Sequence, residues 1–180
     1  MTPPEALSRS PGPGGEVDTT RVRTRRLSLR TLDEAMAEAE RLAAGARAGS
    51  LRQLGNWTPG QIFGHLAWWV DGAFDGYPMR TTWLERVMAR LTKHAVLRRP
   101  LPRGYRVPGA PEGTYGTQQL GLEEGLSRLR AAYGRLRAGS PARPHPAFGR
   151  MTHEEWVMLQ LRHAENHLRF LELPGDEARE

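Results

Sequence analysis

The chain has 180 residues and a net charge of +6, with 38% hydrophobic and 26% charged residues, a length that suits one domain with a sizeable core. It has no cysteine, which excludes disulfide scaffolds, cysteine-ligated zinc, iron–sulfur clusters and thiol nucleophiles within the chain. No apolar run approaches the roughly 20 residues that span a bilayer, and the amino terminus lacks a hydrophobic signal core. We therefore expect a cytoplasmic protein with no membrane partner.

The positive charge raises the question of nucleic-acid binding. Lys93 is the only lysine, and the excess of arginine gathers at residues 21–30 and 80–106. Neither stretch interleaves basic and aromatic residues as a base-stacking surface does. We therefore expect no specific nucleic-acid partner and interpret the arginines as a solvated surface.

The chain begins with a segment of low complexity. Residues 1–22 are rich in Pro, Gly, Ser and Thr and are predicted to be disordered. The alternation of apolar and polar residues at 22–29 (VRTRRLSL) predicts an extended segment along the folded domain. The folded domain is expected over residues 23–173, followed by a tail at 174–180.

Three capping boxes mark helix starts, because a threonine hydroxyl and a side chain three residues later satisfy free backbone N–H groups there. They are TLDE, TPGQ and THEE, and they predict helices over about 31–48, 58–73 and 152–173. The pattern is weaker between them. It predicts a short helix over 83–95, a loop dense in Pro and Gly over 98–116, and a helix with regularly spaced leucines over 117–138.

Four amphipathic helices without a convincing sheet predict an all-α protein built as a four-helix bundle. The connection between the helices expected at 58–73 and 117–138 is long. Such a connection favours a crossover, after which these two helices run in the same direction. The short helix over 83–95 would lie within this crossover.

Three of the six histidines fall on inward positions of predicted helices. His65 has apolar residues at helical spacing around it. His163 and His167 are four residues apart, which places both imidazoles on one helix face about 6 Å apart along the axis. The other three histidines are interpreted as surface or local structural residues: His94, His145 and His153.

Three imidazoles that converge in a core need partners for their lone pairs. A buried polar ring without a partner costs about 1–3 kcal/mol, and burial opposes charging it. A divalent metal supplies the partner directly, and three histidines would leave an open coordination position as in catalytic zinc sites. The alternative is a non-catalytic bundle in which the histidines bond to one another or to water, and which binds a small ligand or a protein.

Several known catalytic motifs are absent. Zinc proteases of the HExxH class carry their general base directly after the first histidine, where this chain has Ala164. Glu165 lies about 200° around the helix from His163 and points away. The sequence has no Gly-x-Ser-x-Gly elbow and no Walker loop.

Four segments together resemble an uncharacterised branch of the DinB/YfiT-like superfamily over about residues 23–173: GNWTPGQIFGHLAWW, DGYP, PRGYRVP and HPAFGRMTHEEWVMLQLRHAENHLRFL. The resemblance implies a bundle of up-down-down-up order and a metal on His65, His163 and His167. Relatives include thiol-dependent transferases, isomerases and proteins assigned as metal-dependent hydrolases, and they often form homodimers. This branch commonly has a further histidine where this chain has Asn166, which puts a fourth imidazole in doubt.

The sequence thus predicts a metal-dependent enzyme, of hydrolase or thiol-dependent transferase type, that binds zinc or nickel and acts on a small-molecule substrate. Trp68, Trp69 and Tyr105 are candidates for a pocket wall, although core packing explains the tryptophans more readily. Arg103 or Arg106 in the loop is a candidate for holding an acidic substrate, unless that loop is only an exposed crossover. Asn166 and Glu165 are expected to support the ligands or to lie at the surface, and no proton-transfer residue is identified.

Overall fold

The computed structural model describes residues 17–79, 81–102, 104–107, 110 and 113–176. Within them the protein is mostly helical, which confirms the predicted all-α class. The elements in chain order are α1 (Leu32–Arg47), β1 (Arg52–Gln53), α2 (Pro59–Asp75), α3 (Trp83–Arg98), α4 (Leu122–Ala138), α5 (His153–Leu168) and β2 (Leu171–Glu172). Most of the segment predicted to be disordered, and the end of the predicted tail, lie outside the described residues.

Threonine hydroxyls cap four of the five helices in the described residues. Each accepts a hydrogen bond from the backbone N–H three residues later, and the four are Thr31, Thr58, Thr82 and Thr152. In α3 and α5 a glutamate side chain also bonds back to the threonine, which completes the capping box. The predicted starts of α1, α2 and α5 are therefore confirmed to within one residue.

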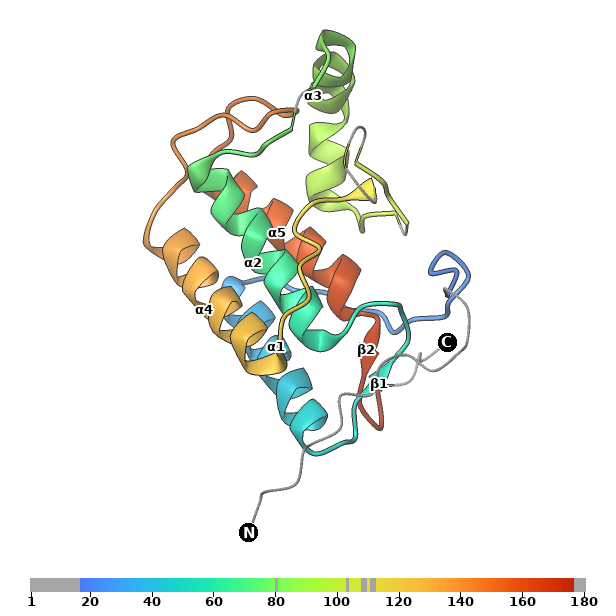
Figure 1. Ribbon diagram of the computed structural model, residues 1–180. Coiled ribbons are helices and arrows are strands. Elements are labelled where there is room, and N and C mark those ends of the chain that lie inside the picture. Colours follow the sequence, from blue (N-terminus) through green and yellow to red (C-terminus); the bar gives the residue numbers. More distant parts are fainter. Residues whose placement is uncertain (1–16, 80, 103, 108–109, 111–112, 177–180) are drawn as a thin grey trace.

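α2 and α4 lie side by side and run in the same direction (Figure 1). At their first turns the backbones approach closely, because Gly60 and Gly125 face each other. A Cβ atom on Gly125 would overlap the carbonyl oxygen of Gly60. Near their last turns, Arg135 of α4 bonds Asp75 of α2 at 2.7 Å. Parallel neighbours need a connection that returns to the starting end, and residues 76–121 make it.

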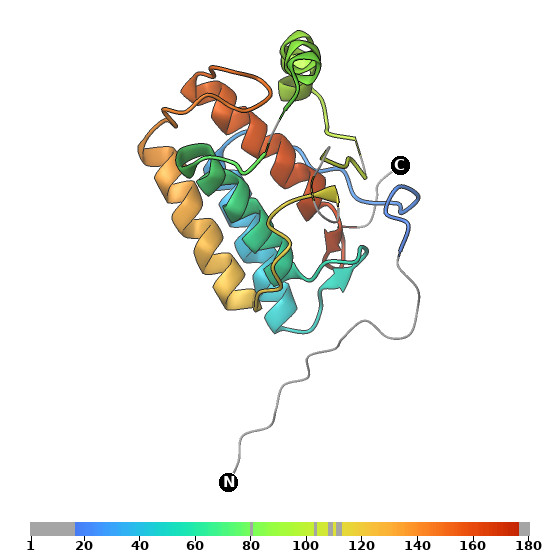
Figure 2. The same ribbon diagram turned by 45° about the horizontal axis from the view of Figure 1, so that its top comes forward.

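α1 and α5 run in the opposite direction to α2 and α4 (Figures 1 and 2). Arg47 at the end of α1 bonds Glu123 at the start of α4 at 2.7 Å, and Arg137 near the end of α4 pairs with Asp33 at the start of α1. The four helices share one core. Its largest fully buried side chains are Trp156, Tyr133 and Phe63.

α4 and α5 differ in length from the prediction. α4 begins at Leu122 rather than at residue 117, because Gly121 is the helix cap and passes over the first turn of α2. α5 ends at Leu168, and the chain then forms β2, which pairs antiparallel with β1. The expectation of no sheet was therefore wrong for these two strands. Strands of two residues are too short to show the alternation of apolar and polar residues that predicts a strand.

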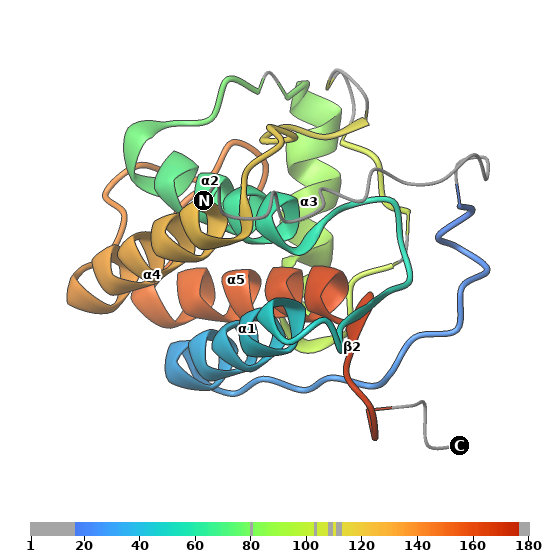
Figure 3. The same cartoon turned by 60° about the horizontal axis from the view of Figure 1, so that its bottom comes forward.

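The segment before α1 has no regular secondary structure and runs along the edge of the helices beside α1 (Figure 3). It also makes hydrogen bonds with α5. The backbone N–H of Leu29 donates to Glu165 at 2.6 Å, and Arg162 donates to the Leu29 carbonyl oxygen at 2.7 Å. The guanidinium of Arg25 is buried, pairs with Glu38 and donates to the Leu168 carbonyl oxygen at 3.2 Å. This placement agrees with the prediction that the segment lies along the folded domain.

α3 stands apart from the other helices (Figures 1 and 2). Leu97 is its only buried residue. Lys93 ties its middle to α5 through an ion pair with Glu155 at 2.7 Å. In the described part of the chain, no helix combines the length and the apolar character needed to cross a membrane.

Candidate metal centre

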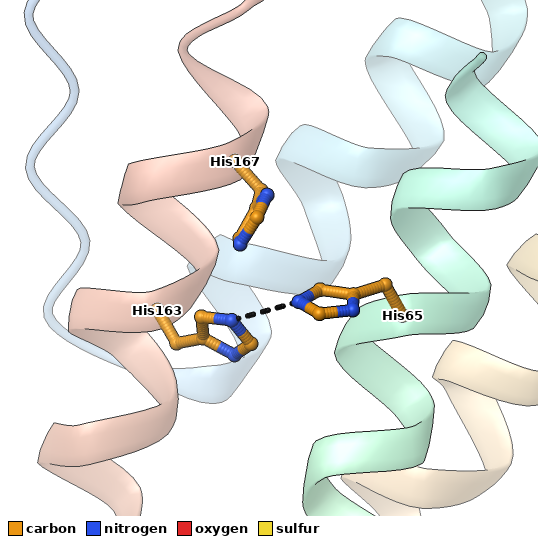
Figure 4. A group of neighbouring side chains, drawn as sticks. All are labelled: His65, His163 and His167. Atoms are coloured by element: carbon orange, nitrogen blue, oxygen red, sulfur yellow. Dashed lines mark hydrogen bonds between the residues drawn. The ribbon is translucent and has the colours of Figure 1, made fainter. Parts of the chain in front are cut away.

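Three histidines from two helices point toward one another (Figure 4). His65 comes from α2, and His163 and His167 come from α5. Their nitrogens that could bind a metal all lie within 4.8 Å of one another, and the Nε2 atoms of His65 and His163 are 3.1 Å apart. The three rings that the sequence predicts to converge do come together.

The surroundings of the histidines follow from the helix packing. α4 covers one side of α2 and α5 covers another, so His65 on α2 is only 1% exposed. His163 and His167 lie one turn apart on α5 and are half-buried. The cluster therefore sits at the edge of the core, where a ligand can reach it from one side.

Burial keeps the three imidazoles neutral. It lowers the pKa of His65 to about 4. Burial first, and the neighbouring His65 second, also lower the pKa values of His163 and His167 well below the usual 6.5. A neutral imidazole presents one lone pair, and this is the form that binds a divalent metal.

The orientation of His65 fits a metal ligand. The backbone of Tyr115 and Gly116 lies close to its ring, and its buried Nδ1 has no hydrogen-bond partner in the described residues. With a proton on Nδ1, the Nε2 lone pair is directed at His163 and is free to bind a metal. Two nitrogens on one tetrahedral zinc lie roughly 3.3 Å apart, close to the 3.1 Å found between the Nε2 atoms.

Two tryptophans fix the histidine rings in place. Trp57, just before α2, stacks on His167 with ring centroids 5.4 Å apart and meets the edge of His65 at 4.7 Å. Trp69 meets His163 edge-on at 5.6 Å and lines the adjoining cavity. Trp68 instead stacks on Tyr115 outside that cavity, so only one of the two tryptophans predicted as wall candidates has that position.

A cavity of about 1020 Å³ adjoins the cluster. All three histidines line it, together with side chains from α3 and from the loop that follows α3. Tyr105 and Arg106 of the loop are among its lining residues, as the sequence interpretation allowed. Arg103 lies outside the described residues. The walls are mainly apolar, with contributions such as Met88, Phe148 and Phe170.

His145 has the local structural role that the sequence interpretation allowed, but its place beside the cluster was missed. It is only 7% exposed and lines the same cavity. Its Nδ1 accepts hydrogen bonds from the backbone N–H groups of Ala147 and Phe148, both at 3.1 Å. The proton must then sit on Nε2, and burial lowers the pKa of His145 to about 4. The sequence HPAFG at residues 145–149 predicts a turn, but nothing in it predicts that this turn lies beside the cavity.

The remaining candidate residues have other roles. Glu165 is buried rather than at the surface, and it faces away from the cluster, since it bonds Leu29 and Arg162. Asn166 lines the cavity and accepts a hydrogen bond from Arg169. His94 is exposed on α3, and His153 is half-buried at the first residue of α5.

These features define an all-α protein with a neutral three-histidine cluster at the wall of a cavity. Residues 21–173 match the family described as "protein of unknown function (DUF1569)", and the chain belongs to this family. None of the curated proteins and none of the solved structures matches the chain. The resemblance to an uncharacterised domain family is confirmed at this level, and the function has to be argued from the site.

Proposed function

We propose that the protein is a metal-dependent enzyme of hydrolase or thiol-dependent transferase type, with one zinc or nickel ion held by His65, His163 and His167. The observation that carries the proposal is the convergence of three neutral imidazoles, from two helices, within 4.8 Å. A cluster of this kind can hold a metal ion. The cavity beside it is of the size that takes a small-molecule substrate.

The helix directions support a fold of the DinB type. α1 and α5 run one way and α2 and α4 the other, which is the up-down-down-up order, with the crossover that contains α3 between α2 and α4. This order supports our proposal that the protein is a four-helix bundle of the DinB/YfiT-like superfamily. That assignment carries with it the expectation of a three-histidine ligand set.

An ion held by three imidazoles would keep an open coordination position, and it would polarise a substrate oxygen or activate a bound water or thiol. Each protein side chain has a separate task. Trp57 and Trp69 hold the ligand rings in orientation and exclude water from them. His145 presents a neutral Nε2–H group on the same cavity wall, and we assign to it a hydrogen bond to a substrate oxygen. Arg106 at the cavity rim would hold an acidic group of the substrate.

The proposal is tested by metal analysis of protein purified without a histidine tag. We expect about one equivalent of zinc or nickel per chain, or uptake of one equivalent when either ion is added. His163→Ala should abolish occupancy while the helical circular dichroism is retained. His94→Ala, which changes an exposed histidine on α3, is the matched control and should bind as the wild type does.

A wild-type protein that is stable without metal and takes up neither ion would contradict the proposal. It would favour the alternative, a non-catalytic bundle that binds a small ligand or a protein. If metal is bound, incubation with small ester and amide substrates, with and without a low-molecular-weight thiol, separates the hydrolase from the transferase. His145→Asn should then reduce turnover without reducing metal content.

A further inference from the structure

The exposed apolar residues of the protein are concentrated on α3. The described residues include seven large hydrophobic side chains that are exposed, and five of them belong to this helix. They are Trp83 at 74%, Leu84 at 55%, Val87 at 42%, Met88 at 53% and Leu91 at 74%. Leu84, Val87 and Leu91 follow the i, i+3, i+7 spacing and share one outward face with Trp83, whereas Met88 lines the cavity. We call Trp83, Leu84, Val87 and Leu91 the α3 face.

The opposite side of the helix accounts for its attachment to the body. Lys93 pairs with Glu155 and donates to the Arg150 carbonyl oxygen, Leu97 is buried, and Ala89 and Val96 line the cavity. The α3 face therefore points outward because the other side is already used. Apolar side chains in such a contiguous group mark a binding surface rather than scattered surface residues.

The net charge of the chain is concentrated in the same place. Residues 81–102 contain five basic residues and one acidic residue, so this short segment carries +4 of the total of +6. Arg98 and Arg99 follow the α3 face at the end of the helix. Arg86 and Arg90 lie seven residues before Lys93 and Leu97, so they lie on the side of the helix nearer the body. There Arg86 donates to the Thr81 carbonyl oxygen at 2.9 Å, and Arg90 lies against Gly149. All four are exposed.

We propose that the α3 face binds the surface of an anionic lipid membrane, with the helix lying in the plane of the interface. A helix with Trp and Leu on its outward side and two arginines at its end has the features of an interfacial amphipathic helix. The apolar side chains enter the boundary of the acyl chains, and the arginines meet the anionic headgroups. This binding mode needs no membrane-spanning segment.

The charge argues for lipid over a second copy of the chain. Two copies that met through this face would bring the exposed Arg98 and Arg99 of each copy together, and like charges oppose such contact. An anionic membrane offers the opposite charge and an apolar layer at once. The inference is independent of the metal proposal, because it uses a helix whose outward face takes no part in the histidine cluster.

The test is flotation of the full-length protein with lipid vesicles. The vesicles are phosphatidylcholine alone, or phosphatidylcholine with about a third phosphatidylglycerol. We expect the protein to float with the anionic vesicles at about 50 mM salt, to be released at about 500 mM salt, and to stay unbound with the neutral vesicles. Failure of the wild type to float with anionic vesicles would overturn the proposal.

Two double variants separate the apolar and the charged parts of the face. Leu84→Ser with Leu91→Ser should lower the partition coefficient by at least about tenfold. Arg98→Gln with Arg99→Gln should lower it by about 30-fold, since each arginine near an anionic surface contributes about a factor of five. Circular dichroism confirms that each variant is folded.

The controls make the same changes elsewhere. Val17→Ser removes another exposed apolar side chain, and Arg26→Gln with Arg30→Gln removes the same charge from the segment before α1. Both should bind within about twofold of the wild type. An equal loss in the Arg26 and Arg30 variant would show that only net charge matters and would overturn the proposal. So would a wild-type dimer in analytical ultracentrifugation that the Leu84 and Leu91 variant dissociates, because the face would then join two copies.

Discussion

Helices α2 and α3 are neighbours in the chain, have 17 and 16 residues, and both begin at a threonine cap, but their surroundings are opposite. In α2, 11 residues are buried, whereas in α3 only Leu97 is buried. α2 carries charge only near its end, at Asp71 and Asp75, while α3 has a charged residue in every turn. Capping thus decides where a helix begins, and the distribution of charge around it decides how deeply it can be buried.

The largest expected difference between the two helices comes from the same substitution made in each. Leu66 of α2 is 0% exposed and Leu91 of α3 is 74% exposed. Leu66→Ala should lower the free energy of unfolding by about 2–5 kcal/mol, because it leaves a cavity in the core. Leu91→Ala should change it by less than about 0.5 kcal/mol. Denaturant titration measures both, and a comparable cost at Leu91 would mean that α3 is covered in solution.

A second prediction concerns the contact that fixes α2 in the core. Gly125→Ala places a methyl group against the carbonyl oxygen of Gly60, where backbone rather than a flexible side chain must move. We expect a loss of about 3 kcal/mol in unfolding free energy. Gly134→Ala in the same helix is the control, since a Cβ there meets no atom within 4 Å, and it should be neutral or stabilising by up to about 1 kcal/mol. Equal effects at the two glycines would refute the close approach of α2 and α4.

Lowering the pH should reduce the unfolding free energy through a buried histidine, by less than the substitutions in α2 and α4 do. Because burial lowers the pKa of His145 from 6.5 to about 4, the unfolded chain binds a proton between these pH values that the folded protein does not. The stability from this residue is complete above pH 6.5 and is lost as the pH falls toward 4. His145→Asn keeps an acceptor for the backbone N–H groups but does not titrate.

The measurement is the unfolding free energy of metal-free protein at pH 7 and pH 5. The advantage of the wild type over H145N should shrink by on the order of 2 kcal/mol between the two values. H94N, which changes an exposed histidine on α3, is the control and should be as stable as the wild type at both pH values. An unchanged difference between wild type and H145N would show that His145 is not held neutral in the fold.

The sequence was sufficient for the parts of the structure that depend on local signals. The capping boxes located the starts of α1, α2 and α5, and the spacing of His163 and His167 indicated a shared helix face. That His65 meets them is a long-range property, and it was predicted from burial and from a family resemblance rather than from spacing.

The features that were missed depend on contacts between distant residues. The β1–β2 pair has two residues in each strand. Strands this short show no alternation of apolar and polar residues, and they pair because the fold brings residues 52–53 next to residues 171–172. His145 was assigned to the surface or to local structure because prolines flank it in the sequence, and only the packing of the turn beside Tyr77, Phe148 and Trp156 makes it an interior residue. α4 begins later than predicted because Gly121, its cap, lies against the first turn of α2.

The parallel arrangement of α2 and α4 has a consequence for how the protein can diversify. Two parallel neighbours require only that the chain return to its starting end. The end of the returning segment is constrained, because Tyr115 and Gly116 lie beside His65 and Gly121 lies against Gly60, but the part before it can change in length and composition while the Gly60–Gly125 contact stays as it is. The helices hold the histidines, and the earlier part of the returning segment shapes the cavity beside them. The shape of the cavity can therefore change in this protein while the three-histidine cluster stays as it is.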